Sequence, residues 1–293
     1  MPEVSVILPT CDRPDLVGRA LRSVLGQTDV DLEVLLVDSN HDAEPVRTNA
    51  NVLDMLADDR VRLIEPDPRP FSAASARNAA LPLVRGNWVS YLDDDDLYEP
   101  GKLAAQLELA RESGKPLVLC GYTFVWPGGR QRRRQCDRSV FRDDELLFGA
   151  EFMTSLLLHR RDEPWRFDES VGSGDDRIAT LELFQRHDVH EVPCVPRALV
   201  TVFCQEMSVH KHREAAWWGC LQGLRVARRG QFSRRARRQF LHAAALERAA
   251  RGYGDWFHLT RLALGWMRQT GVSGWRFVAY AYSTRGRRLF GNG

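Results

Sequence analysis

Short apolar runs alternate with amphipathic stretches along the first 120 residues. Residues 4–8, 32–37 and 61–64 are rich in Val, Ile and Leu, residues 88–92 are apolar and aromatic, and all four runs predict buried strands. Between the first two runs, residues 16–25 place apolar side chains at helical spacing, after a proline suited to a first helical turn. A strand, helix, strand order predicts parallel strands, so their carboxyl ends should meet at one edge of a sheet.

The rest of the chain up to about residue 212 predicts more helices and one more strand. Residues 72–81 form a small-residue helix whose alanines allow close packing, and helical patterns also begin at Lys102 and at about Arg177. Residues 117–120 predict a strand. Residues 127–138 are Gly- and Arg-rich and predict an exposed basic loop, either a solvated connection or a mobile lid or acceptor contact.

Four consecutive aspartates, Asp93–Asp96, follow the predicted strand at residues 88–92. Carboxylates this close are costly inside a fold unless a cation or several donors satisfy them. In open α/β sheets, ligands bind at the carboxyl ends of the strands. An Asp-x-Asp pair there could chelate a hard divalent cation whose other positions are taken by substrate phosphates. The alternative is a solvated acidic turn that caps the helix from Lys102.

The composition is that of a globular protein, and the charged residues are distributed unevenly along the chain. The chain has 293 residues, 44% hydrophobic and 27% charged, which supports a core and excludes global disorder. The net charge is +2, but residues 1–212 hold 25 basic against 36 acidic residues, whereas residues 213–293 hold 16 arginines against three acidic residues. Residues 213–293 also carry helical patterns with aromatic clusters. They predict a helical subdomain, a basic surface for anionic lipid or an acidic acceptor, or an oligomer interface.

Cysteine spacing and hydropathy bear on the compartment. The six cysteines have no C-x-x-C or zinc-like spacing, so we interpret them as reduced thiols of a cytosolic protein. The N-terminus lacks the basic start and long apolar core of a signal peptide, and no stretch approaches the roughly 18 apolar residues of a membrane span. We expect a cytoplasmic protein, with peripheral contact at the inner face of the membrane through the basic tail as a further option.

Five motifs, in this order, resemble the family 2 glycosyltransferases of the GT-A fold over roughly residues 3–210. They are the opening strand and Pro-Thr turn at 4–13, a nucleotide turn at 37–39, an Ala-Arg-Asn helix at 76–81, an Asp-rich metal motif at 92–97, and a Phe-Asp-Glu stretch at 167–170 with a base motif at 175–176. The resemblance implies an α/β, Rossmann-like, mostly parallel central sheet flanked by helices. We divide the chain into a catalytic domain at 1–212, with a nucleotide-sugar half at about 1–120 and an acceptor half at about 121–212, and a helical Arg-rich appendage at 213–293.

The resemblance also implies a reaction and roles for individual residues. A sugar would pass from a nucleotide diphosphate, most often UDP, to an acceptor with inversion at the anomeric carbon. Mn²⁺ or Mg²⁺ would be held by Asp93 and Asp95, with His210 as a candidate third ligand, and Asp176 or its neighbour Asp175 would be the general base. The residues that the resemblance places at the nucleotide are Pro9, Thr10, Cys11, Arg13, Asp38, Arg77, Asp93 and Asp94.

Three departures from the family pattern keep other functions open. Cys11 stands where an aromatic residue is usual, the nucleotide turn lacks its glycine, and Gln205 falls where a metal-binding His is expected. A non-catalytic, degenerate sugar-nucleotide-binding protein is therefore an alternative. A nucleotidyltransferase or an NAD-dependent dehydrogenase is less favoured, because residues 9–14 form no Gly-rich loop.

The partners of the chain are only partly predicted. The acceptor is open among saccharides, lipid-linked sugars, peptides and small natural products, and a homo-oligomer is also open. Nucleic acid is not expected, because no recognition motif accompanies the basic charge.

Overall fold

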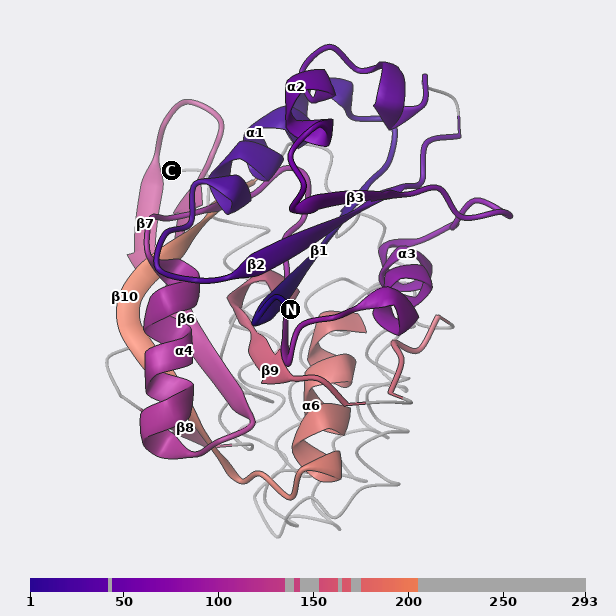
Figure 1. The fold of residues 1–293 in the computed structure, drawn as a ribbon. Helices are drawn as coiled ribbons and strands as arrows, with labels where there is room; N and C mark the ends of the chain where they lie inside the picture. Colours follow the sequence, from indigo (N-terminus) through magenta and orange to yellow (C-terminus); the bar gives the residue numbers. More distant parts are fainter. Residues whose placement is uncertain (42–43, 135–139, 143–152, 163–164, 170–174, 205–293) are drawn as a thin grey trace, which may run out of the picture.

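In the computed structural model, a mixed sheet lies between two layers of helices (Figure 1). The structure describes residues 1–41, 44–134, 140–142, 153–162, 165–169 and 175–204. The predicted helical appendage at 213–293, Gln205 and the candidate ligand His210 all lie outside the described residues, so these predictions stay untested.

Ten strands form the described sheet, in the order β3-β2-β1-β4-β9-β6-β10-β5, with β7 paired to β6 and β8 paired to β10. The first four are parallel: β1 (Val4–Thr10), β2 (Leu32–Asp38), β3 (Val61–Ile64) and β4 (Trp88–Tyr91). The others are β5 (Leu97–Tyr98), β6 (Leu117–Val125), β7 (Gln131–Arg134), β8 (Val140–Arg142), β9 (Leu158–Arg160) and β10 (Glu191–Phe203).

The expectation of a mostly parallel sheet holds for β1 to β4 and for the β6–β10 pair, and it is wrong for the other pairs. The short strand β9 lies antiparallel between β4 and β6, while β5, β7 and β8 each pair antiparallel with a neighbour. Only β6 and β10 continue the parallel pattern. A strand of three residues gives little periodic signal, which is why the sequence does not reveal β9.

The helices cover both faces of the sheet. α1 (Pro14–Leu25) and α4 (Lys102–Ser113) pack on one face, and α3 (Ala73–Ala80) and α6 (Asp175–Arg186) pack on the other. The short helix α2 (Leu53–Leu56) and the 3₁₀ turns η1 (Val46–Thr48), η2 (Leu81–Leu83) and η3 (Thr154–Leu156) lie in the connections. The core therefore has two halves, one on each side of the sheet.

Local sequence explains where the main helices begin and end. Pro14 opens α1, and the backbone N–H of Gly26 closes it on the carbonyl of Arg22. Ser72 caps α3 through a reciprocal capping box with Ser75. α4 lies between two glycines with positive φ, a conformation that costs glycine little.

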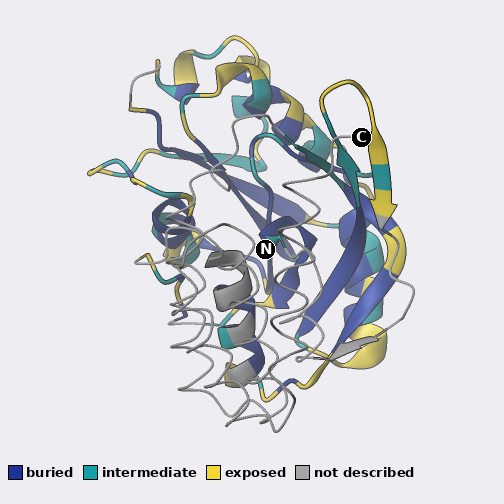
Figure 2. Ribbon diagram, turned by 180° about the vertical axis from the view of Figure 1, so that it is seen from behind, coloured by how far each residue is buried: buried dark blue, intermediate teal, exposed yellow. Residues whose placement is uncertain are grey.

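The parallel strands β1 and β2 are buried along their whole length, whereas the β6–β7 hairpin is exposed at its tip (Figure 2). The predicted basic loop at 127–138 is thus a strand over residues 131–134, and residues 135–139 lie outside the described part of the chain. The guanidinium of Arg130 lies 4.4 Å from the ring centroid of Trp126, and that of Arg132 lies 5.3 Å from Phe124. The hairpin is therefore an ordered edge with stacked arginines.

Two further sequence expectations concern compartment. Cys11, Cys120 and Cys204 carry free thiols, but Cys194 is disulfide-bonded, so the prediction of six reduced thiols is wrong at Cys194. In the described part of the chain, no helix combines the length and the apolar character that crossing a membrane requires.

Candidate functional site

Three parallel strands bring their carboxyl ends together at one edge of the sheet. Thr10 at the end of β1 pairs in register with Asp38 at the end of β2, and Pro9 pairs with Val37. On the other side of β1, the backbone N–H of Leu92, just past β4, donates to the carbonyl of Ile7 at 3.1 Å. The sequence-predicted residues Pro9, Thr10, Asp38 and the Asp93–Asp96 run therefore meet, as expected from the parallel order.

The Asp run forms a turn whose side chains alternate between inside and outside. The N–H of Asp96 donates to the carbonyl of Asp93 at 3.1 Å and closes the turn before β5. Asp94 and Asp96 are buried, at 1% and 4% exposure. The side chains of Asp93 and Asp95 are 32% and 21% exposed. The two members of the predicted Asp-x-Asp pair are thus the two that a ligand can reach.

The inward carboxylates are held by the protein itself. Thr10 Oγ1 donates to Asp94 Oδ2 at 2.7 Å, and the other oxygen of Asp94 lies 3.3 Å from the Arg13 guanidinium. Burial raises the pKa of Asp94 to about 6, against the opposing effects of Arg13 and Thr10. Asp96 accepts from the N–H of Phe203 at 3.2 Å, and burial raises its pKa well above the usual range. Asp94 and Asp96 therefore fix the turn, and a direct contact of Asp94 with nucleotide stays a prediction.

Each outward carboxylate is paired with an arginine from another element. Arg77, on α3, donates to Asp93 Oδ1 at 2.7 Å, and Arg13, at the start of α1, donates to Asp95 Oδ2 at 2.8 Å. Burial and the neighbouring Asp93 raise the pKa of Asp95. The four carboxylates are thus partly neutralised by two arginines, both of which the family resemblance places at the nucleotide.

Asp38 organises the loop that replaces the expected glycine turn. Its carboxylate accepts from the N–H of Asn40 and the N–H of Val46, each at 3.0 Å, and pairs with Arg69 at 2.9 Å. These contacts hold the loop without a glycine, because the Asx-type hydrogen bond supplies the turn. Asp38 is fully buried, so its predicted contact with the base or ribose stays a prediction.

Cys11 is exposed in the connection between β1 and α1, beside a neighbour with positive φ that contacts the loop after β2. Asp12 has a φ of +51°, and it is held by hydrogen bonds from its own N–H to Asn40 Oδ1 and from the N–H of His41 to its carboxylate. Burial and the carboxylate of Asp12 raise the pKa of the Cys11 thiol. The loop therefore presents a neutral thiol where the resemblance expects an aromatic ring.

The Ala-Arg-Asn helix and the Phe-Asp-Glu stretch meet on the other side of the site. Asn78 Nδ2 donates to the carbonyl of Phe167 at 2.9 Å and to Glu169 at 2.7 Å, and the N–H of Phe167 donates to Asn78 Oδ1 at 2.8 Å. The guanidinium of Arg77 lies 5.3 Å from the Phe167 ring centroid. Two motifs that lie far apart in the chain thus support one arginine.

The candidate bases Asp175 and Asp176 are the first two residues of α6, on the face of the sheet that α3 also covers. Acidic residues in a first helical turn are also expected from capping and the helix dipole. Their position at a helix start is as predicted, while their role as base stays a prediction.

Comparison with known proteins decides the family. The model of the family described as "Glycosyl transferase family 2" matches residues 5–167, more than half of the chain. The chain belongs to glycosyl transferase family 2. Succinoglycan biosynthesis protein ExoO of Rhizobium meliloti is 30% identical over 195 residues, which are 61% of this chain and 54% of that relative. The chain thus spans about half the length of this relative.

Solved structures with little sequence identity share the fold. S. aureus TarS in complex with UDP-GlcNAc superposes with a TM-score of 0.69 at 14% identity, over 95% of this chain and 81% of that one. The mannosyltransferase PcManGT from Pyrobaculum calidifontis, in complex with GDP-Man and Mn²⁺, gives a TM-score of 0.61 at 20% identity, over 100% of this chain and 88% of that one. The family 2 architecture therefore fits the GT-A-like arrangement of sheet and helices.

The described residues fit a metal site that a substrate completes. No group of three or more His, Cys, Asp or Glu side chains converges as a metal cage within the described ranges. Asp93 and Asp95 nevertheless offer two accessible carboxylates at the ligand-binding edge. Mg²⁺ is typically bound through one or two carboxylates and substrate phosphates, so this donor set suits a cation that arrives with a diphosphate.

Two residues at the site were missed by the sequence reasoning. Arg69 pairs with Asp38, and Phe203 anchors Asp96 through its backbone while the guanidinium of Arg19 lies 4.4 Å from its ring centroid. The Pro-rich stretch at residues 66–70 marks an ordered turn and could have drawn attention to Arg69. Nothing local signals Phe203, because its contact joins the end of β10 to the turn before β5, about a hundred residues earlier in the chain.

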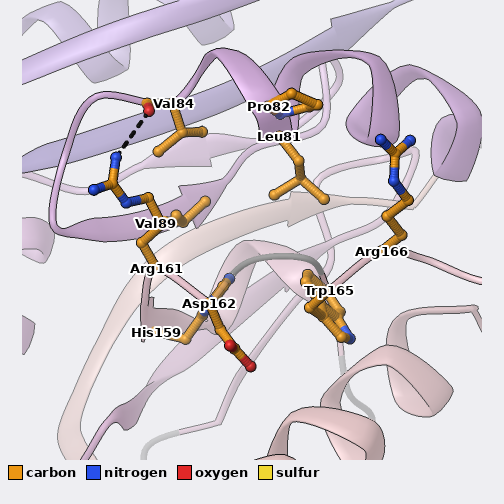
Figure 3. Close-up of a pocket in the computed structure, with 9 residues that line it drawn as sticks. All are labelled: Leu81, Pro82, Val84, Val89, His159, Arg161, Asp162, Trp165 and Arg166. Atoms are coloured by element: carbon orange, nitrogen blue, oxygen red, sulfur yellow. Dashed lines mark hydrogen bonds between the residues drawn. The ribbon is translucent and has the colours of Figure 1, made fainter.

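A pocket of the family 2 domain lies away from the Asp run (Figure 3). Leu81 and Val89 face Trp165 across it, and Arg161 at its rim donates to the carbonyl of Val84 at 3.1 Å. It is lined from the amino-terminal half of β4, whereas the Asp run follows the carboxyl end of that strand. This pocket is therefore separate from the candidate nucleotide-sugar site.

Proposed function

We propose that this family 2 glycosyltransferase moves a sugar from a nucleotide diphosphate, with UDP favoured, to an acceptor by metal-assisted direct displacement with inversion. The observation that carries the proposal is the carboxyl edge of β1, β2 and β4. There, the accessible carboxylates of Asp93 and Asp95 are paired with Arg77 and Arg13. Such an edge offers both ligands for a hard cation and cations for a diphosphate.

The chemistry explains why carboxylates and arginines should share this place. Breaking the bond to the sugar leaves negative charge on the departing nucleotide diphosphate. A divalent cation bound at Asp95 and Asp93 would supply the positive charge that stabilises this leaving group. Arg13, which is partly exposed, is positioned to add hydrogen bonds to the phosphates, since a guanidinium matches phosphate oxygens in a fork geometry. Arg77, which is buried, is positioned to orient the carboxylate of Asp93.

Inversion requires the acceptor to attack the face opposite to the leaving group, and a base must remove its proton. We assign that base to Asp176, with Asp175 as the alternative, at the start of α6. An ordinary aspartate is a weak base for a hydroxyl, so the adjacent carboxylate would have to raise its pKa. The acceptor is drawn from four classes of molecule: saccharides, lipid-linked sugars, peptides and small natural products.

Support for UDP comes from the comparisons, which also include a GDP-sugar enzyme. TarS binds UDP-GlcNAc in its solved complex, and PcManGT binds GDP-Man with Mn²⁺. In this chain the nucleobase of the donor would meet Thr10, Cys11 and Asp38 at the ends of β1 and β2. Because Cys11 supplies no aromatic ring for stacking, selection of the nucleobase would rest on hydrogen bonds from these two connections.

The test is a panel of UDP-, GDP- and dTDP-sugars with and without Mn²⁺, scored by thermal shift and by release of nucleoside diphosphate. We expect one donor to stabilise the protein and to be turned over in a metal-dependent way. Asp95→Asn should abolish both effects. Asp54→Asn is the matched control, because Asp54 is an exposed residue on α2, outside the turns that follow β1, β2 and β4.

Asp176→Asn separates donor binding from chemistry. It should retain the thermal shift by the donor and lose transfer to any acceptor. Stabilisation by a donor without turnover under any acceptor condition would favour the non-catalytic sugar-nucleotide-binding protein. No response to any donor, with or without metal, would refute the glycosyltransferase proposal.

A further inference from the structure

The two accessible carboxylates of the Asp run differ in how their arginine partners are held. The Arg77–Asp93 pair joins a guanidinium side chain that is 2% exposed to a carboxylate that is 32% exposed. The Arg13–Asp95 pair has the opposite arrangement, with Arg13 42% exposed and Asp95 21% exposed. In the first pair the arginine is therefore the less exposed member, and in the second pair the aspartate is the less exposed member.

Arg77 is fixed in its place. It lies on α3 and is buried near the ring of Phe167, which Asn78 holds through two hydrogen bonds to the Phe167 backbone. A buried arginine that leaves its carboxylate loses a charge-assisted hydrogen bond without gaining water. Arg77 should therefore stay on Asp93 throughout the binding of a donor.

Arg13 is held less tightly. It precedes Pro14 at the start of α1, and the described partners of its guanidinium are the carboxylates of Asp94 and Asp95. In the Arg13–Asp95 pair both side chains are partly exposed, and such ion pairs are weak, because water replaces the lost partner at little cost. Asp94 is buried, but Thr10 Oγ1 still donates to it when Arg13 turns away from Asp95. Arg13 can therefore exchange one anionic partner for another.

We propose that Arg13 is an exchangeable counter-ion: it occupies Asp95 until a divalent cation arrives with a diphosphate, and it then turns to the diphosphate. This inference rests on the proposed function and adds an order of events to it. Arg13 and a cation compete for Asp95, because two positive groups near one carboxylate repel each other and Arg13, unlike the buried Arg77, can move away. A diphosphate relieves the repulsion by giving Arg13 a new anionic partner.

As a consequence, Arg13 couples the binding of the metal to the binding of the nucleotide. Mn²⁺ alone must displace Arg13 from Asp95, whereas Mn²⁺ with UDP leaves the arginine paired. Each ligand should therefore strengthen the binding of the other by the same factor, since binding free energies are reciprocal. Removing Arg13 should make Mn²⁺ bind more tightly by itself and should reduce the coupling.

The experiment measures Mn²⁺ binding directly, from the electron paramagnetic resonance signal of free Mn²⁺, with and without UDP. The variants of the full chain are Arg13→Ala and Arg13→Lys, with Arg22→Ala as the control. Arg22 is an exposed arginine on the same helix. Lysine keeps the charge and lacks the fork, so it tests whether charge at this position is what excludes the cation.

We expect Arg13→Ala to lower the Kd for Mn²⁺ alone by about 1.5-fold to fivefold, the range of an exposed ion pair. The tightening of Mn²⁺ binding by UDP should shrink by about the same factor. The Kd of Arg13→Lys for Mn²⁺ should lie near that of the wild type, and the Kd of Arg22→Ala should equal that of the wild type. A merely structural role for Arg13 would not raise metal affinity.

The outcomes separate this inference from the proposed function. If Mn²⁺ and UDP bind the wild type together but Arg13→Ala leaves the Kd for Mn²⁺ alone unchanged or higher, the exchange is refuted while the donor site stands. If the wild type binds neither Mn²⁺ nor UDP, both are refuted. Tighter Mn²⁺ binding in both Arg13→Ala and Arg22→Ala would also overturn the proposal, because it would show a general charge effect.

Discussion

Lys102, the first residue of α4, is fully buried beside the strand that leads into the Asp run. Its Nζ donates to Ser90 Oγ at 2.7 Å and lies 3.9 Å from the ring centroid of Tyr98. Among the described residues, no carboxylate lies within ion-pair distance of it. Burial accordingly lowers the pKa of Lys102 from 10.5 to about 7. Replacing it by methionine keeps a long unbranched side chain and removes the charge.

The lowered pKa of Lys102 gives the size and the sign of the change in the free energy of unfolding. In the unfolded chain Lys102 is protonated below pH 10.5, whereas in the folded chain it is half neutral at about pH 7. At 1.36 kcal/mol per pKa unit, burying it costs about 4 kcal/mol at pH 7 and about 1 kcal/mol at pH 10. The Lys102→Met variant lacks this cost and forfeits one hydrogen bond worth about 1 kcal/mol. Ser90 still donates to the carbonyl of Leu157.

Urea unfolding of Lys102→Met and wild type at pH 7 and pH 10 measures the difference. We expect the variant to be more stable by about 3 kcal/mol at pH 7 and nearly equal to the wild type at pH 10. Lys115→Met, at an exposed lysine in the connection after α4, should change little at either pH. A variant that is destabilised equally at both pH values would refute the assignment of a buried lysine with a lowered pKa.

The remaining predictions concern packing and the exposed thiol. Gly86→Ala places a Cβ 2.6 Å from the backbone nitrogen of Ser5 and should cost more than about 2 kcal/mol in urea unfolding, whereas Gly26→Ala, with 3.3 Å to the nearest atom, should cost less than about 1 kcal/mol; equal costs would contradict the reasoning. Asn78→Ala leaves the backbone of the Phe-Asp-Glu stretch unpaired and should cost about 2–4 kcal/mol in the same assay, and a loss below about 0.5 kcal/mol would argue against this contact. Among the three free thiols that the structure describes, iodoacetamide should modify Cys11 first, and UDP with Mn²⁺ should slow that reaction. An unchanged rate, followed by mass spectrometry, would separate Cys11 from the nucleotide.

The amino-terminal half of the fold was accessible from sequence because its elements are local and strongly patterned. The apolar runs at 4–8, 32–37, 61–64 and 88–92 correspond to β1 to β4, and the 3.6-residue stripe from Leu16 corresponds to α1. Three of these strands, β1, β2 and β4, are buried on both faces, so a continuous apolar run was sufficient to recognise them.

The second half was less accessible for physical reasons. β10 contains Pro193 and Pro196, which indicate a break in a strand, and its register with β6 shifts around Ala198. β7 consists of one glutamine and three arginines, whose polarity hides the period of two. Arg132 is accommodated there because its guanidinium stacks near the rings of Phe124 and Trp126. Such pairing depends on contacts between strands and leaves no local signal.

The candidate site likewise has features that the local sequence reveals and features that depend on contacts between distant residues. The position of the Asp run at a strand end followed from the sequence, and the structure shows that Asp93 and Asp95 are the accessible pair. The pairing of these two residues with Arg77 and Arg13 could not be read from spacing, because the partners lie 16 and 82 residues away. These pairs matter for function, since they set how much charge the site holds before a donor binds.

The most direct measurement is a crystal structure of the chain with UDP and Mn²⁺, using the anomalous signal of manganese. We expect a manganese peak at the carboxylate of Asp95, bridged to the diphosphate, with the base beside Thr10 and Asp38. Arg77 should stay on Asp93, and Arg13 should be turned toward the diphosphate. UDP bound elsewhere, for example in the pocket beside Trp165, or a manganese peak away from the Asp run, would contradict the assignment of this edge as the donor site.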